Sequence, residues 1–305
     1  MAAYAVRRLF QFAPTLLIIL LLTFTLSRLT GDPARLVLGL GASEEAVQQF
    51  RRTHGLDQPV PVQFLRYVLQ VLRGDLGVSL RYQEPVLQLF LQRLPATLQL
   101  GLSTLLLSSV SGVAAGVYCA VSWGTLPERF LSLLVLVGQA VPGFLLGLLA
   151  ILLFALHFRV LPAGGHGSAA HLVLPTLTLG LNLMALTARF SRSALLEVLS
   201  QDYVRTARAK GLGARTVLYR HALRNALVPI LTLVATQSAV LFSGAVVTET
   251  VFSWPGIGRF AVEAILSRDF PVIQGTVLIL TVLVLLVNLL VDLSYGLLDP
   301  RIRYT

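Results

Sequence analysis

The feature that most constrains this chain is a series of long segments without a charged side chain. Six such runs are present, at residues 9–27, 94–127, 130–158, 160–188, 225–248 and 270–291. Each reaches the roughly 18 residues that a helix needs to cross about 30 Å of hydrocarbon. Only 12% of the 305 residues are charged, against about a quarter in soluble proteins. The sequence therefore predicts an all-α membrane protein with six transmembrane helices.

The charged stretch at residues 31–93 separates the first two runs and is predicted to stay in water or at the interface. Ser43, followed by two glutamates, has the composition of a helix N-terminus, and this helix should run to about Thr53. A second helix is predicted after Pro59 and Pro61 and through Leu72, where apolar residues recur at helical spacing. We expect a small helical extracytoplasmic insertion that caps the membrane domain, with direct ligand binding as the alternative.

The placement of basic residues predicts the topology. The net charge is +10, which could suggest a nucleic-acid partner. With an inside N-terminus and six crossings, however, thirteen of the 24 basic residues fall on the inside in under half of the extramembrane length. We therefore expect a multi-pass protein of the bacterial inner (plasma) membrane, with both termini cytoplasmic and no nucleic-acid partner. The first run, preceded by Arg7 and Arg8, is interpreted as a retained helix rather than a cleaved signal.

Several residues inside the runs predict how the helices pack. Gly112-x-x-x-Gly116 and Gly143-x-x-x-Gly147 remove side-chain bulk from one helix face and favour close approach of backbones. Pro142 removes a backbone donor and should kink the third helix. The only cysteine excludes an intrachain disulfide and a cysteine metal cluster.

The segment at residues 189–224 carries eight basic residues, and insertion of this segment into hydrocarbon would be prohibitive. We expect a cytoplasmic loop in which Asp202 caps a short helix through Lys210. Gly211 should end this helix in a left-handed conformation, and a second helix should run from about Ala214 to Ala226. On composition alone, such a basic loop could instead be a belt that binds the lipid surface.

Two strings in this loop are informative: Asp202-Tyr203-Val204-Arg205-Thr206-Ala207-Arg208-Ala209-Lys210-Gly211-Leu212 and His221-Ala222-Leu223-Arg224-Asn225-Ala226-Leu227-Val228-Pro229. With these strings the loop resembles that of the dipeptide, oligopeptide and nickel class of ABC importer permeases. The general motif of such permeases is Glu-Ala-Ala, three residues and then Gly, and here Arg205 replaces the leading acid.

Shorter fragments extend the resemblance over nearly the whole chain. They are Gly31-Asp32-Pro33, Gly74-Asp75-Leu76-Gly77, Leu161-Pro162 with Gly164-Gly165, Glu249-Thr250-Val251-Phe252 with Pro255-Gly256-Ile257-Gly258, and Leu298-Asp299-Pro300-Arg301-Ile302-Arg303. Each fragment is weak alone, but their order and spacing make the resemblance strong.

The resemblance implies a type I ABC importer permease fold and a division of labour between subunits. The chain has no phosphate-binding loop, because its only lysine, Lys210, precedes Gly211. We therefore expect a transport subunit rather than an enzyme, with no cofactor of its own and with ATP and Mg on partner ATPase subunits. The implied partners are a second homologous permease, two ATP-binding subunits and an extracytoplasmic solute-binding protein.

The implied coupling loop is the part that a partner ATPase would contact. Its residues are Tyr203, Val204, Arg205, Thr206, Ala207, Arg208, Ala209, Lys210, Gly211 and Leu212. The implied function is uptake of dipeptides or oligopeptides by alternating access. An ion-gradient-driven secondary transporter or channel is the alternative from a different class, and nickel and glutathione systems share these motifs.

Polar side chains within the runs are candidates for the translocation pathway, because polar groups are costly in a bilayer. These candidates are Asn182, Gln237 and Asn288, for which hydrogen bonding between helices is an equal or better interpretation. Asp292 is interpreted as an interfacial partner of an arginine. We predict no catalytic residue and no metal site, since the spacing of His157, His166 and His171 matches no compact ligand motif.

The expected organisation has four parts. They are a first transmembrane helix at 1–30, the extracytoplasmic helical region at 31–93, a five-helix permease core at 94–298 with the coupling loop at 189–228, and a cytoplasmic tail at 299–305.

Overall fold

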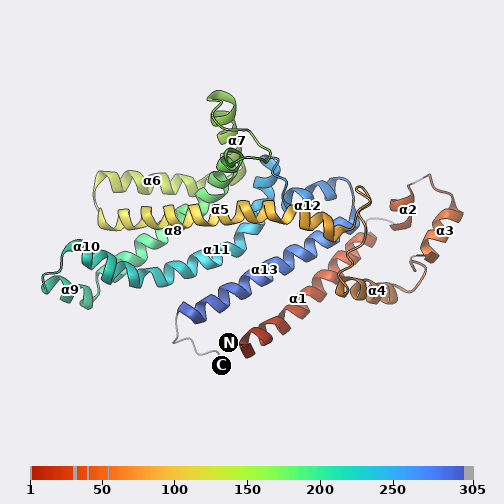
Figure 1. Cartoon of the computed structure of the whole chain (residues 1–305), viewed down its shortest axis with the longest axis horizontal. Helices are drawn as coiled ribbons and strands as arrows, with labels where there is room; N and C mark the ends of the chain where they lie inside the picture. Colours follow the sequence, from red (N-terminus) through yellow and green to blue (C-terminus); the bar gives the residue numbers. More distant parts are fainter. Residues whose placement is uncertain (1, 30–32, 40, 54, 299–305) are drawn as a thin grey trace. The chain divides into compact units, whose positions relative to one another are not determined.

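The computed structural model describes residues 2–29, 33–39, 41–53 and 55–298, in which the regular elements are helices joined by turns and loops, with one isolated β-bridge (Figure 1). It forms two compact units, one of residues 1–95 and 260–286 and the other of residues 96–259 and 287–305. The family-like fragments at 31–33 and 298–303 lie outside the described residues except for Pro33 and Leu298, and the expected tail at 299–305 lies wholly outside them. The predicted all-α fold is confirmed.

The first unit contains the N-terminal helix, the helices of the predicted insertion and parts of three later helices. Its complete helices are α1 (Ala2–Leu29), α2 (Pro33–Leu38), α3 (Glu44–Thr53) and α4 (Val60–Leu72). It also includes the start of α5 (Val86–Val121) and most of α12 (Ile257–Leu266) and α13 (Phe270–Leu298).

Two sets of contacts hold the first unit together. Phe24 of α1 packs against Phe64 and Tyr67 of α4, with ring centroids 5.3 and 5.9 Å apart. The buried carboxylate of Asp269 accepts a hydrogen bond from the Ser79 hydroxyl at 2.6 Å and bonds from two backbone amides that follow it. Burial of these aromatic rings and pairing of the buried charge stabilise the unit.

The two helices predicted in the insertion are confirmed. Ala46 N donates to the Ser43 hydroxyl at 3.3 Å, so Ser43 caps α3 as expected. α4 begins at Val60, so Pro61 lies in its first turn instead of before it, and the helix ends at Leu72 as predicted. Gly74 and Gly77 then have φ of +79° and +84°, a conformation that a residue with a Cβ adopts only with strain.

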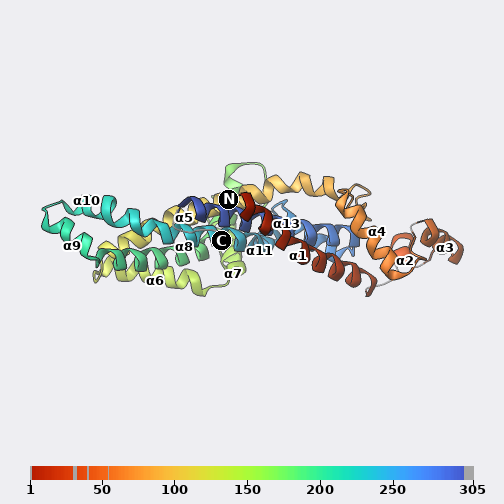
Figure 2. The same ribbon diagram turned by 90° about the horizontal axis from the view of Figure 1, so that it is seen from below.

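The second unit is a helix bundle arranged around α8 (Ala169–Leu199), which packs against α6 (Leu126–Ala140), α7 (Gly143–Ala150) and α11 (Arg224–Val251) (Figure 1). The π-helix η1 (Ile151–His157) extends α7. Three short elements connect α8 to α11, namely α9 (Asp202–Ala209), α10 (Ala214–Thr216) and the π-helix η2 (Val217–Leu223). These short elements lie together at one end of the bundle in both views (Figures 1 and 2).

The third apolar run is a broken helix rather than a kinked one. α6 and the α7–η1 segment are bent by 105° relative to each other. Val141 at the break is extended, with φ −84° and ψ +129°, as expected for a residue that precedes a proline. Pro142 therefore acts where it was predicted to act, but it ends α6 and starts α7 instead of bending one continuous helix.

Among the described residues, four helical segments are long and apolar enough to cross a membrane. They are Phe10–Leu29, Val86–Val121, Ala169–Leu199 and Phe270–Asp292, and the bent pair of α6 with α7–η1 makes a fifth if it is one span. The fifth apolar run is also helical, since α11 extends over 28 residues.

The first glycine pair packs closely, as predicted, but the second does so only in part. A Cβ on Gly112 would lie 2.7 Å from Thr187 Cβ, and one on Gly116 would lie 2.5 Å from the Ala188 carbonyl oxygen. α5 and α8 therefore approach so closely that only glycine fits. In the second pair, Gly147 packs against Phe252, whereas Gly143 has open space around it.

Candidate functional site

The candidate coupling loop is a short helix, α9, whose two faces have different environments. Val204 and Ala207 are buried, with 0% and 7% of their surface exposed, against Val217 of η2 and the last turn of α8. The other eight candidate residues are exposed: Tyr203, Arg205, Thr206, Arg208, Ala209, Lys210, Gly211 and Leu212. The structure thus divides the predicted set into two residues that attach α9 to its own chain and eight that a partner could reach.

The structure of the loop follows the prediction in one respect and departs from it in two. Gly211 has φ of +79°, so the helix ends in the predicted left-handed conformation. Asp202, however, is the first helical residue, and the N-cap is Gln201 without a side-chain hydrogen bond. The second predicted helix does not end near Ala226, because α10, η2 and α11 follow one another without a break. The loop is therefore joined directly to the fifth apolar run.

A hydrogen bond adds a second attachment between α9 and the bundle. The amide of Asn225, at the start of α11, donates to the Tyr203 hydroxyl at 2.9 Å. α9 is thus held by apolar packing against α8 and η2 and by a hydrogen bond to α11.

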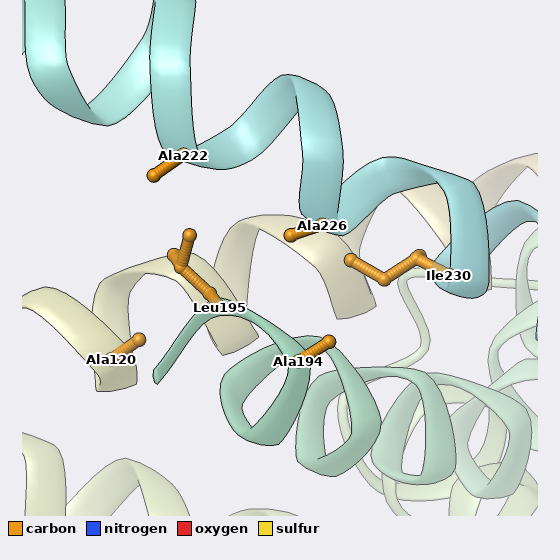
Figure 3. Close-up of a cluster of buried hydrophobic side chains, with 6 residues drawn as sticks. All are labelled: Ala120, Ala194, Leu195, Ala222, Ala226 and Ile230. Atoms are coloured by element: carbon orange, nitrogen blue, oxygen red, sulfur yellow. The ribbon is translucent and has the colours of Figure 1, made fainter. Parts of the chain in front are cut away.

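Small buried side chains fill the bundle next to the loop (Figure 3). Ala222, Ala226 and Ile230 lie on the η2–α11 segment, and Leu195 of α8 points toward them (Figure 3). Ala120 of α5 and Ala194 of α8 complete this cluster. The small side chains let three helices approach closely, so they should move as one block.

An ion pair between a buried carboxylate and a partly exposed arginine joins α6 and α8 in the second unit. Glu128 is 4% exposed, and its carboxylate accepts a bond from Arg192 at 2.8 Å and one from the Ser132 hydroxyl at 2.9 Å. The sequence analysis did not single out this pair, because Glu128 stands beside Arg129 between two apolar runs and has the appearance of an exposed loop acid.

The candidate pathway residues lie in different surroundings. Gln237 is 4% exposed and forms a hydrogen bond between helices with Thr187, at 3.2 to 3.3 Å. Asn182 is exposed and lines a cavity of about 320 Å³ with Thr178 and Thr248. Asn288 is exposed on α13. Asn182 also donates to the Gln139 carbonyl oxygen of α6 at 3.4 Å. Both Gln237 and Asn182 therefore form hydrogen bonds between helices, as in the alternative interpretation, and Asn182 in addition lines a cavity.

A buried carboxylate, not predicted from the sequence, organises the turn between α11 and α12. The carboxylate of Glu249 accepts from the Thr97 hydroxyl at 2.7 Å and from Arg259 N at 3.1 Å, and Ile257 N donates to Thr97 Oγ1 at 2.8 Å. A Cβ on Gly256 would overlap this carboxylate. The glycines of the Pro255-Gly256-Ile257-Gly258 fragment thus make room for Glu249.

A second family-like fragment packs against the same turn. Gly165 N donates to the Phe252 carbonyl oxygen at 2.8 Å, and a Cβ on Gly164 would overlap that oxygen. His166 lies against Trp254, with ring centroids 4.7 Å apart, and hydrogen-bonds Gln99. His171 pairs instead with the Ser168 hydroxyl at 2.9 Å. His157 lies against Phe158, with ring centroids 4.9 Å apart. The three histidines considered as metal ligands therefore have separate contacts, and the glycines position the loop on the turn.

Comparison with known families assigns both parts of the chain. Residues 112–304 match the family described as binding-protein-dependent transport system inner membrane component. Residues 1–101 match the N-terminal region of the membrane components of such systems.

Full-length relatives and solved structures agree with this assignment. The chain is 44% identical to the probable peptide ABC transporter permease protein y4tP of Sinorhizobium fredii and 41% identical to the glutathione transport system permease protein GsiC of Salmonella paratyphi A, over 100% of both chains in each case. In fold it is similar to the MetNI methionine ABC transporter in an inward-facing conformation, with a TM-score of 0.60 over 70% of this chain and 97% of that chain, at 18% identity. The chain therefore belongs to the binding-protein-dependent transport system inner membrane components and is a permease subunit of an ABC importer.

Proposed function

We propose that this permease forms half of the translocation pathway of a peptide importer and that α9 is the element through which ATP hydrolysis drives it. A permease of this family is not itself an ATPase and holds no cofactor, so the energy comes from ATP-binding partner subunits, and a solute-binding protein delivers the solute. The proposed assembly is one of this chain, a second homologous permease, two ATP-binding subunits and one extracytoplasmic solute-binding protein. Family membership favours this assembly over an ion-gradient-driven transporter.

The observation that carries the proposal is the division of α9 into a buried apolar face and an exposed basic face. Arg205, Arg208 and Lys210 are exposed, and a basic face of this kind can pair with acids on a partner. Val204 and Ala207 tie the same helix to α8 and η2. A rigid-body movement of the partner would therefore reach α8 and α11 directly, as alternating access requires.

The proposed topology has six crossings with both termini in the cytoplasm. Four apolar spans, the bent pair and α11 would supply these crossings. The insertion at 31–93 and the Glu249 turn would then both face the extracytoplasmic side of the membrane. The proposed parts keep the boundaries 1–30, 31–93, 94–298 and 299–305, with the coupling loop at 189–228. In the second unit, the cavity beside Asn182 is the proposed contribution to the pathway.

The proposed substrates are short peptides, including dipeptides, oligopeptides and glutathione. This proposal rests on the names of full-length relatives that are 41% to 44% identical, one described as a probable peptide permease and one as a glutathione permease. Uptake of labelled peptides and of glutathione by the reconstituted importer would test it, and competition between the two would show whether one pathway serves both.

Site-directed crosslinking tests the coupling role. The native Cys119 is buried and would first be replaced by serine. In that background, Arg208→Cys should crosslink to an ATP-binding subunit, whereas the adjacent Ala207→Cys, whose side chain is buried, should not. A membrane-impermeant thiol reagent applied to intact cells should label Arg73→Cys in the insertion and leave Arg208→Cys unlabelled. Labelling of Arg208→Cys from outside would overturn both the topology and the coupling role.

A further inference from the structure

The first unit contains a cavity of about 430 Å³ where α1, α4 and the start of α13 meet. Arg28, near the end of the apolar span Phe10–Leu29, lines one side of this cavity. Phe270 and Gln274, in the first turns of the span Phe270–Asp292, line another side. Because one apolar span ends and another begins at the cavity, it lies at the boundary between hydrocarbon and lipid headgroups.

The cavity lining is cationic. Arg28 and Arg66 contribute their side chains, and no aspartate or glutamate is among the described residues that line the space. Arg28 stacks on the Phe24 ring, 4.1 Å from its centroid, and donates through Nη2 to the Gln63 side chain. An oxyanion in the cavity would give the guanidinium groups of Arg28 and Arg66 a charged acceptor.

The helix α4 has the amphipathic character of a helix that lies in a membrane interface. Gln63, Arg66, Tyr67 and Gln70 follow helical spacing on the face that lines the cavity. The apolar residues of the other face are exposed, and α4 has no fully buried residue. These exposed residues are Val62, Leu65, Leu69 and Leu72. A helix with this division buries its apolar face in the headgroup and acyl boundary of a bilayer.

The end of α1 also has exposed apolar residues. Leu22, Leu26 and Leu29 are exposed on α1, which packs against α4 through Phe24 (Figure 1). A molecule with a phosphate in the cavity and acyl chains along these leucines would match both the charge and the apolar surface. A free phosphate or a peptide carboxylate would use the same arginines but would leave the leucines without contact.

We propose that this cavity binds the phosphate headgroup of an anionic membrane phospholipid, with Arg28 and Arg66 as the phosphate ligands. Arg28 and Arg66 would each contribute guanidinium N–H groups, since planar guanidinium groups match the geometry of phosphate oxygens. The bound lipid would bridge α1 and α4 and hold the insertion against the membrane surface.

Native mass spectrometry of the purified full-length permease, stripped of lipid in detergent, tests the proposal. On titration with phosphatidylglycerol, the first lipid should bind the Arg28→Gln/Arg66→Gln variant at least about tenfold more weakly than the wild type, because charged hydrogen bonds are lost. Arg73→Gln removes an exposed arginine of the same region that does not line the cavity, and its affinity should be unchanged. Phosphatidylcholine should bind more weakly than phosphatidylglycerol, and only the latter should depend strongly on the two arginines.

Two further measurements keep the test decisive. If the double variant does not fold, Arg66→Gln alone serves, because Arg66 is exposed and its loss should weaken lipid binding several-fold without affecting folding. Glycerophosphoglycerol, the phosphodiester that remains when the acyl chains are removed from phosphatidylglycerol, should compete poorly. Competition by glycerophosphoglycerol equal to that of the lipid would assign the cavity to a soluble anion and overturn the proposal. An equal loss of lipid binding in Arg73→Gln, or no loss in the arginine variants, would also overturn it.

Discussion

Replacement of Ala207 by leucine is the most direct test of how α9 is coupled to the bundle. Ala207 is 7% exposed and shares a cluster with Val204 and Val217, which are 0% and 2% exposed. Extra carbons in a packed site of this kind cost about 1–3 kcal/mol. α9 has only eight residues and is not stable as an isolated helix, so we expect the strain to detach it from η2.

The size of the expected shift between attached and detached α9 follows from this strain. A cost of about 1–3 kcal/mol lowers the ratio of attached to detached α9 by a factor of about 5 to 150. Peptide uptake per ATP hydrolysed should fall in the reconstituted importer, while membrane insertion of the permease is unchanged. Ala207→Ser, which adds a single oxygen, is the matched control and should keep most of the coupling.

A cysteine at Val217 reports directly whether α9 still covers η2. In the background without Cys119, Val217→Cys should react slowly with a thiol reagent, because the site is buried. The same cysteine combined with Ala207→Leu should react at least about fivefold faster, in line with the shifted equilibrium. Normal uptake per ATP in Ala207→Leu, with Val217→Cys still protected, would refute the idea that packing of α9 transmits the movement.

Three further substitutions test other parts of the second unit. Gln237→Leu removes a hydrogen bond between helices and should lower the free energy of unfolding by under about 1 kcal/mol, measured by thermal unfolding in detergent, while peptide uptake is retained. Loss of uptake without loss of stability would instead assign Gln237 to the pathway. Glu128→Gln removes the charged partner of Arg192 and should destabilise the permease by about 1.5–3 kcal/mol in the same unfolding assay. An unchanged melting temperature would contradict a structural role for this ion pair. Gly256→Ala should displace the Glu249 carboxylate and destabilise the protein by about 1–3 kcal/mol. Gly143 has open space around it, so Gly143→Ala is the control and should leave the stability nearly unchanged. Equal effects of the two substitutions would argue against the close fit at Glu249.

Some features of the candidate site were accessible from the sequence because they depend on neighbouring residues. The basic segment around Arg205 and Arg208 had to leave the membrane whatever the rest of the chain does. Gly211 had to end a helix because a left-handed residue is required there and glycine adopts it without strain. The division of α9 was not accessible, since Ala207 and Ala209 are identical residues two positions apart, and only packing against Val217 makes the first buried and the second exposed.

The sequence by itself determined which segments are helical and apolar enough for a membrane, because hydrocarbon requires long uncharged helices wherever the chain crosses it. Tertiary structure decided what each polar residue does. Glu249 accepts a hydrogen bond from Thr97, 152 positions away in the sequence, and Gln237 is hydrogen-bonded to Thr187. Arg28 lines a cavity together with Arg66 of another helix. Such pairs depend on how helices pack, and local sequence patterns do not encode which distant side chain will supply a buried polar group with its partner.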